Sequence, residues 1–184
     1  MVEMSLKNSV NFSSMAARAS SDASRSSGKS SQSVADIRGT ELGQGAKALC
    51  CTVKGNGVKL HVLGVLPADK QADLQKLAAA VGGRRASLAS PEEVMALTGS
   101  VFGAVPPVSF TDDLVLIADP SLFERYEEIA FNAGRLDASI IIRTEDYRRI
   151  VHPQGNLNFC ARPLNRLSPS KRRRRSSERR LRCL

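Results

Sequence analysis

The sequence predicts a mixed α/β fold, of the α+β kind, in which helices pack around a mixed sheet. Short apolar runs typical of strands intermix with short amphipathic segments typical of helices, without strict alternation. One pair of apolar runs flanks a tight turn, which indicates a hairpin. The chain has 184 residues, of which 42% are hydrophobic, so it is large enough for one domain with its own core.

Apolar periodicity and turn residues predict the elements in order. Leu74, Leu77 and Val81 would share one face of a helix that stops at Gly82-Gly83. The predicted helices cover residues 34–42 (ending near Gly39), 69–81, 91–98 and 145–151 (capped by Thr144), with a helical turn at Asp119-Pro120. The predicted strands cover residues 48–55 and 58–66 around a Gly-Asn-Gly turn, with Pro67 ending the second, and then 86–88, 114–118, 127–132 and 138–144.

The helix at 91–98 has the clearest boundaries. Ser90 suits the N-cap, Pro91 the first helical position, and Glu93 can complete a capping box. Gly99 ends the helix. A firmly ended helix therefore leads directly into the loop Gly103–Pro107.

Composition divides the chain into three parts. Residues 1–33 include a Ser-rich segment (12–33) with ten Ser and almost no large apolar side chains, which predicts disorder. Residues 162–184 carry ten Lys or Arg and one Glu and read as a disordered tail, whereas residues 1–161 are neutral overall. The Arg172–Arg175 block is either simply solvated, an extra nucleic-acid contact or a localisation signal. The folded domain is expected over residues 34–161.

The sequence also argues against several classes of protein. Aromatic residues are 4% of the chain, which argues against broad base stacking, and the neutral domain argues against a grip on long duplex nucleic acid. No apolar run is long enough for a membrane helix and no secretory signal is evident, so we expect a cytoplasmic protein. The four Cys and two His form no ligand motif, and the adjacent Cys50 and Cys51 would point to opposite faces of a strand, so no metal site is expected.

Three positions carry candidate chemistry, since no nucleophile elbow, phosphate loop or dinucleotide fingerprint occurs. Lys47 is either a solvated strand-edge lysine or a cation for a phosphate or carboxylate. The loop Gly103–Pro107 is either a structural corner or a rigid wall of a site. The turn Asn132–Gly134 is either ordinary or a source of backbone N–H groups around an oxyanion.

Four segments together resemble the YbaK/prolyl-tRNA synthetase-associated editing family, and its bacterial YeaK-like free-standing members most closely. The segments are VADIRGTELGQGAKAL, ASLASPEEVMALTGSVFGAVPPVSF, DPSLFERYEEIAFNAGRLDASIII and TEDYRRI, in order between about residues 34 and 151. The resemblance implies a partly barrel-like mixed sheet with flanking helices. It also implies a trans-acting aminoacyl-tRNA deacylase that needs no metal or redox cofactor. Its substrate would be the acceptor end of a tRNA mischarged with a small amino acid such as Ser, Thr, Ala or Cys.

The resemblance also assigns roles to residues. Lys47 matches a signature lysine beside the terminal adenosine or phosphate, and the loop matches a G-x-x-x-P wall of the aminoacyl pocket. A positioned water, with backbone N–H groups stabilising the oxyanion, could hydrolyse this already activated ester without a protein nucleophile. The catalytic candidates are Lys47, Gly103, Asn132 and Gly134, and the substrate-binding candidates are Ala104, Val105, Pro106, Pro107, Ala133 and Ser139.

Two features depart from the family pattern. Relatives usually have another strand and helix before the IRGT segment, where this chain is Ser-rich, and the Arg-rich tail is foreign to the family. A missing strand would open one wall of the pocket. A non-catalytic tRNA-binding or adaptor module with the same fold is therefore the alternative hypothesis.

Overall fold

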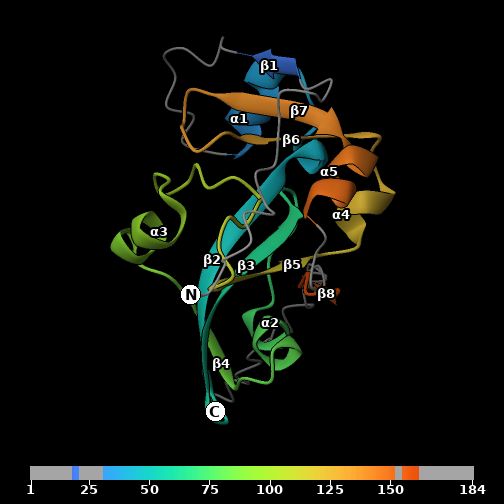
Figure 1. The fold of residues 1–184 in the computed structure, drawn as a ribbon. Coiled ribbons are helices and arrows are strands. Elements are labelled where there is room, and N and C mark those ends of the chain that lie inside the picture. Colours follow the sequence, from blue (N-terminus) through green and yellow to red (C-terminus); the bar gives the residue numbers. More distant parts are fainter. Residues whose placement is uncertain (1–17, 21–30, 152–154, 162–184) are drawn as a thin grey trace, which may run out of the picture.

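The strands of this computed structural model, which describes residues 18–20, 31–151 and 155–161, form two sheets (Figure 1). One has three antiparallel strands in the order β1-β7-β6, and the other has five strands in the order β4-β2-β3-β5-β8. The strands are β1 (Arg18–Ser20), β2 (Ala46–Gly55), β3 (Val58–Pro67), β4 (Arg85–Leu88), β5 (Leu114–Ala118), β6 (Glu128–Asn132), β7 (Ser139–Arg143) and β8 (Gly155–Asn156).

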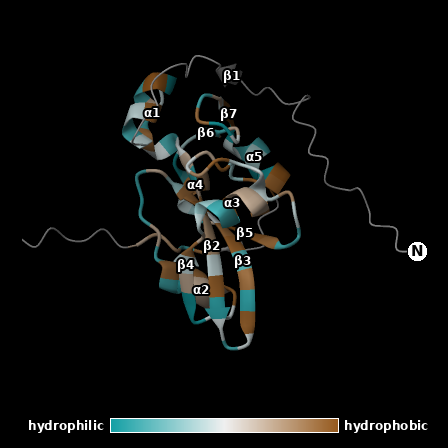
Figure 2. Cartoon of the chain, turned by 90° about the vertical axis from the view of Figure 1, so that its left-hand side faces the viewer, coloured by the Kyte–Doolittle hydropathy of each residue, from teal (hydrophilic) through white to brown (hydrophobic). Residues whose placement is uncertain are grey.

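The five-stranded sheet is built on the predicted hairpin. β2 and β3 pair antiparallel along their whole length, and both turn residues, Asn56 and Gly57, have positive φ. Such a turn matches the twist of the flanking strands. β5 pairs parallel with β3, so the sheet is mixed, as the sequence predicts. The second half of β3 is buried throughout, and Figure 2 shows its hydrophobic character.

The two sheets meet at the start of β2, where Gly45 forms a parallel bridge with Ala130 of β6. A Cβ at Gly45 would lie 2.9 Å from the Cβ of Ala68, so the close approach of Gly45 to Ala68 requires glycine. The mixed α/β class is confirmed, with the sheet divided into two parts that this bridge connects.

The prediction that residues 12–33 are disordered is wrong at two places. β1 pairs with β7, with Ser20 opposite Ser139, and the helix α1 (Ser31–Arg38) begins three residues before the predicted domain boundary. An open strand edge can be paired through backbone hydrogen bonds alone, which hydropathy does not reveal. The rest of residues 12–33, and the tail 162–184, lie outside the described residues.

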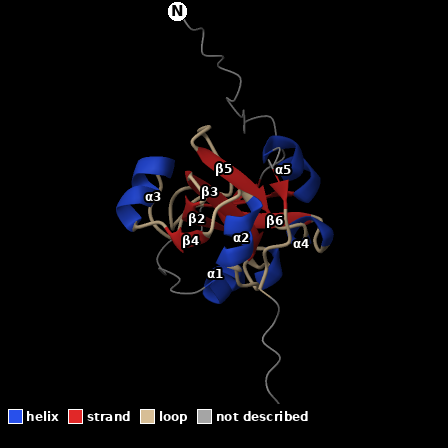
Figure 3. Cartoon of the chain, turned by 90° about the horizontal axis from the view of Figure 1, so that it is seen from below, coloured by secondary structure: helices blue, strands red, loops and turns tan. Residues whose placement is uncertain are grey.

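The helices lie around the strands (Figure 3). Besides α1, two helices differ from prediction. The second helix begins at Leu74 instead of 69, because Asp73 caps it by accepting the amides of Gln75 and Lys76. Thr144 is the first residue of the last helix, and its hydroxyl donates to the Tyr126 carbonyl instead of capping. The remaining helical elements are η2 (Leu42–Gln44, a 3-10 turn), α2 (Leu74–Ala80), α3 (Pro91–Thr98), α4 (Ser121–Glu124) and α5 (Thr144–Val151).

Two hydrophobic clusters cover the opposite faces of the five-stranded sheet. Cys50 belongs to the cluster that includes α3, α5 and β6, and Cys51 belongs to the cluster beneath α2. The two thiols therefore point to opposite faces, as predicted. Burial raises the pKa of Cys51 to about 12, so it is an uncharged core residue.

Hydrogen bonds to Asp119 anchor the last described segment, residues 155–161, to the sheet. Its carboxylate accepts the amides of Phe159 and Cys160, each at 2.9 Å, and the amide and hydroxyl of Ser121. The side chain of Phe159 is fully buried beneath the five-stranded sheet. The Asp119 carboxylate is buried, and these hydrogen bonds compensate for its loss of contact with water, so its role is structural.

Candidate active site

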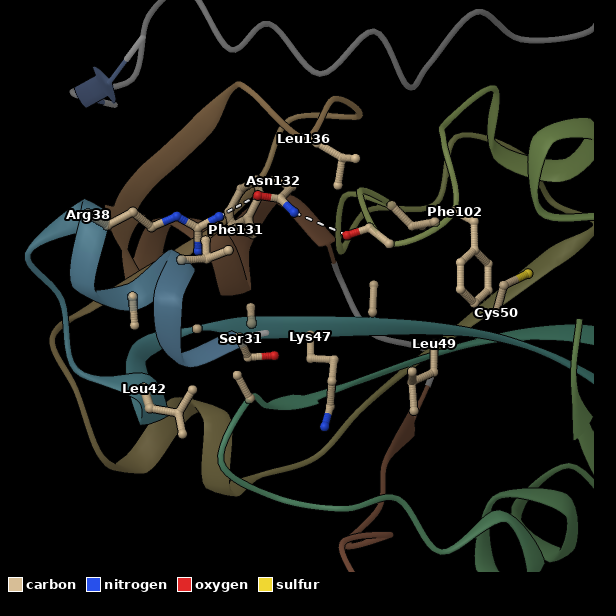
Figure 4. Close-up of a pocket in the computed structure, with 18 of the residues that line it drawn as sticks. Ser31, Arg38, Leu42, Lys47, Leu49, Cys50, Phe102, Phe131, Asn132 and Leu136 are labelled. Carbon is tan, nitrogen blue, oxygen red and sulfur yellow. Dashed lines mark hydrogen bonds between the residues drawn. The ribbon is translucent and has the colours of Figure 1, made fainter. Parts of the chain in front are cut away.

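One cavity lies where the two sheets, α1 and the loop after α3 meet (Figure 4). Its volume is about 510 Å³, which suits a small-molecule-sized ligand. Its walls come from parts of the chain that are far apart in sequence. The lining residues are Ser31, Val34, Ala35, Arg38, Thr40, Leu42, Gly45, Ala46, Lys47, Ala48, Leu49, Cys50, Ala68, Leu88, Val94, Phe102, Gly103, Val105, Phe131, Asn132 and Leu136.

The helix before the loop is capped at both ends, as predicted. Ser90 and Glu93 form the reciprocal capping box, and Gly99 adopts the left-handed conformation at φ 63°. The amide of Gly99 donates to the carbonyl of Met95 at 2.9 Å. These contacts fix the point from which the loop departs, so they position the cavity wall from a distance.

The loop itself is held by hydrogen bonds at its first half. Gly103 has φ +88°, and its carbonyl accepts the Asn132 side-chain amide at 3.1 Å. Ala104 is buried; its amide donates to Val101 at 2.9 Å and its carbonyl accepts the amide of Gly134 at 3.1 Å. Gly103 and Val105 line the cavity, whereas Ala104 lies behind it.

The two prolines are not part of the cavity wall. Neither Pro106 nor Pro107 lines it, and the carbonyl of Pro107 accepts the hydroxyl of the buried Tyr147 at 2.5 Å. Pro107 therefore anchors the far end of the loop to the core, and the expected contact of the two prolines with the aminoacyl group stays a prediction. Their effect on the wall is indirect, through stiffness.

The turn after β6 contributes one of its three candidates to the cavity. Asn132 lines the cavity, but Ala133 and Gly134 do not. The amide of Ala133 donates to Ala138 at 3.0 Å, and that of Gly134 donates to Ala104 at 3.1 Å. Both amides therefore already donate to carbonyl groups in this structure, and their predicted use for an oxyanion would require these hydrogen bonds to break. Gly134 instead joins the turn to the loop.

Arg38, at the end of α1, is the functional residue that sequence reasoning missed. Its Nε donates to the hydroxyl of Ser139 at 2.8 Å, and its Nη2 donates to the Oδ1 of Asn132. The side chain is half-buried and lines the cavity, and burial lowers its pKa. Within the described part of the chain no carboxylate pairs with it. The sequence did contain a signal for Arg38, because this residue belongs to the IRGT segment that carries the family resemblance.

Arg38, Asn132 and Gly103 thus form one hydrogen-bonded row along the upper wall in Figure 4. Ser139 is buried behind Arg38 and does not line the cavity; it serves as an acceptor that orients the guanidinium. A guanidinium has five N–H donors, and this geometry uses two of them. The remaining donors are available to an anion or to a carbonyl oxygen.

Lys47, a site residue expected from the sequence, lines the cavity floor from β2. Figure 4 shows its side chain directed away from Asn132, and its ammonium donates to the Lys70 carbonyl at 2.6 Å. Burial lowers the pKa of Lys47, although Cys160 and Asp69 partly oppose this. The ammonium has two further donors for a ligand on that side of β2.

The described residues contain no cluster of three or more His, Cys, Asp or Glu side chains that could hold a metal ion. Among the helices in the described ranges, none has the length and apolar content needed to cross a membrane. The cavity lining includes the cationic side chains of Arg38 and Lys47, the amide of Asn132 and apolar surface.

Comparisons with known proteins identify the family of this chain. The family model described as "Aminoacyl-tRNA editing domain" matches residues 25–150. The multifunctional Ser/Thr-tRNA deacylase ProXp-y of Escherichia coli K12 is 65% identical over 123 residues, covering 67% of this chain and 74% of that protein.

Solved structures have the same fold. The crystal structure of a candidate trans-editing enzyme for prolyl-tRNA synthetase has a TM-score of 0.61 and 28% identity, over 71% of this chain and 80% of that chain. The hypothetical protein APE2540 has a TM-score of 0.60 at 23% identity, over 69% of this chain and 81% of that chain, which supports the fold alone. The fold, family and deacylase class expected from the sequence are confirmed, and the chain belongs to the aminoacyl-tRNA editing domain family.

Proposed function

We propose that this chain is a trans-acting deacylase that hydrolyses the ester of tRNA mischarged with a small amino acid, and that Ser and Thr are its preferred groups. The observation that carries the proposal is the row Arg38–Asn132–Gly103 on the wall of a cavity of about 510 Å³. The row places donors beside a space that can hold an ester. The preference for Ser and Thr rests on the relative named a Ser/Thr-tRNA deacylase.

The reaction requires a water and a place for the oxyanion. Water adds to the ester carbonyl carbon, the bond to the ribose oxygen breaks, and that oxygen takes the proton, directly or through the neighbouring 2′-OH. The free donors of Arg38 stabilise the oxyanion as charge develops on it. The amides of Gly103 and Val105 can assist, because neither donates to another group in the described ranges.

Lys47 has a different part in the proposal. Its ammonium is on the other side of β2 from Asn132, so it suits a phosphate of the acceptor strand better than the ester. A half-buried ammonium attracts such a phosphate more strongly than an exposed one does, because water screens it less. Its removal should then raise KM more than it lowers kcat.

The alternative hypothesis, a non-catalytic module, assumed that a missing strand leaves the pocket open. α1 supplies Ser31, Val34, Ala35 and Arg38 to the cavity, and β1 pairs with β7 on the side away from β6. No observation in the described structure favours loss of activity. The Arg172–Arg175 block lies outside the described residues; we propose that it adds an electrostatic contact to tRNA, and that the protein acts in the cytoplasm.

The test is release of amino acid from tRNA charged with Ser, Thr, Ala or Cys. We expect turnover of Ser- and Thr-tRNA, with a raised KM for Lys47→Ala. Lys54→Ala is the matched control, since Lys54 is an exposed lysine of the same strand and does not line the cavity. Absence of turnover on all four substrates would refute the proposal.

A further inference from the structure

The cavity is larger than a seryl or threonyl group requires, and its two ends differ in chemistry. Its volume of about 510 Å³ lies in the range that holds a whole drug-sized ligand. Figure 4 shows Arg38 and Asn132 at one end and Phe102, near Cys50, at the other. One end therefore carries the cationic and amide groups of Arg38 and Asn132, and the other, called the apolar end below, carries the aromatic ring of Phe102.

Three large apolar side chains that line the cavity are exposed. Phe102 is 56% exposed, and Leu88 and Leu136, which also line the cavity, are each 53% exposed. Figure 4 shows Leu136 beside Asn132, so Phe102 is the exposed aromatic residue that lines the cavity away from Arg38 and Asn132. A flat, apolar group of the ligand fits this end.

The loop holds Phe102 in place. The amide of Ala104 donates to the carbonyl of Val101, which closes a turn around Phe102 at 2.9 Å. The next residue, Gly103, is tied to Asn132 at 3.1 Å. The ring is therefore presented by a hydrogen-bonded turn, at the same loop that forms the wall beside the ester.

We propose that Phe102 is the stacking platform for the adenine base at the 3′ end of the tRNA. This inference rests on the proposed function. The scissile ester is on the ribose of the terminal nucleotide, so the base is attached to the same sugar and must lie close to the ester. With the ester at the polar end, the apolar end is the part of the cavity left for the base. An aromatic ring offers the base a stacking face that does not depend on which tRNA is bound.

The test compares two loop phenylalanines. Phe110 is 57% exposed, as exposed as Phe102, but does not line the cavity. We expect Phe102→Ala to raise KM for Ser-tRNA about 5- to 20-fold with little change in kcat, as loss of one stacked base predicts. Phe102→Tyr should restore the KM, and Phe110→Ala should leave it unchanged. A KM for Phe102→Ala within twofold of the unmodified protein would overturn the inference.

A binding measurement separates this inference from the proposed function. The probe is the uncharged trinucleotide CCA, titrated by NMR or calorimetry, with CCU as the base-substituted control. We expect Phe102→Ala to weaken CCA binding by the same 5- to 20-fold and to reduce the preference for CCA over CCU. If the protein hydrolyses no charged tRNA but still binds CCA through Phe102, the proposed function fails and the subsite stands. If Phe102→Ala leaves CCA binding unchanged and instead alters the ratio of Ser to Ala release, the apolar end holds the amino acid and the inference is wrong.

Discussion

Replacing Arg38 by Met should impair both stability and hydrolysis, by amounts that the contacts predict. The change removes the hydrogen bonds to Ser139 and Asn132 while keeping an unbranched side chain of similar length. A hydrogen bond from a charged donor contributes about 1.5–3 kcal/mol. Ser139 is only 3% exposed, so its hydroxyl loses its partner, whereas water in the cavity can replace the partner of Asn132. Removing a half-buried cation also recovers desolvation energy.

The net cost should therefore be about 1–3 kcal/mol, which corresponds to a fall in Tm of roughly 3–9 °C. Hydrolysis should fall further, because loss of a donor to a developing oxyanion costs about 10²–10³ in kcat. Arg38→Lys retains the charge but cannot reproduce the planar fork, so we expect it to recover part of kcat.

The assay is deacylation of Ser-tRNA with kcat and KM determined separately, together with thermal unfolding of each variant. Ser139→Ala is the matched control, since it removes one acceptor of Arg38 and leaves the guanidinium in the cavity. It should lower Tm by a few degrees and kcat by less than tenfold. Retention of full kcat and an unchanged Tm in Arg38→Met would refute the reasoning.

Three further predictions concern the loop, the helix cap and the C-terminal segment. Gly103→Ala should lower kcat more than tenfold and reduce the free energy of unfolding by about 1–2 kcal/mol, because the φ of Gly103 is +88°. The new Cβ would have room, since its nearest neighbour is Leu136 at 3.9 Å. The control is Gly57→Ala, at φ +77° in the hairpin turn, which should reduce stability alone. Ser90→Ala should lower the free energy of unfolding by about 1 kcal/mol, measured by urea denaturation, and an unchanged midpoint would contradict the capping box. Burial alone would raise the pKa of Asp119, but the hydrogen bonds from Ser121 and Cys160 outweigh it and lower the pKa. A lowered carboxyl pKa stabilises the fold above the unfolded pKa of about 3.9, and this stabilisation is lost as pH falls through the folded pKa. Asp119→Asn should therefore make the free energy of unfolding less dependent on pH below about pH 4. An unaltered acid-unfolding profile would contradict this.

Local signals in the sequence were enough for most individual elements. The hairpin around residues 55–57 follows from turn residues between two apolar runs, and α3 follows from Ser90, Glu93 and Gly99. These features depend on neighbours within a few positions, so the sequence specifies them without knowledge of the rest of the fold. The alternation of Cys50 and Cys51 across the sheet belongs to the same class.

The candidate site was predicted in part. Lys47, Gly103, Val105 and Asn132 do line one cavity, as their family-like motifs implied. The residues that failed as wall residues, such as Pro106 and Ala133, are sequence neighbours of those that succeeded. A motif identifies a loop, but the direction of each residue within the loop depends on contacts with distant segments.

Periodicity, capping and turn residues act locally, so they were enough to predict the fold class. The resemblance of four segments implied the family and the residues that carry the chemistry. Tertiary structure decided which groups face the cavity. Arg38 becomes a site residue only because α1 packs beside β6 and β7, which lie about 100 positions later. The Gly134 amide is occupied because the Ala104 carbonyl reaches it from another loop. Hydrogen-bond partners so distant in sequence are set by the packing of the two sheets, and no local pattern encodes them.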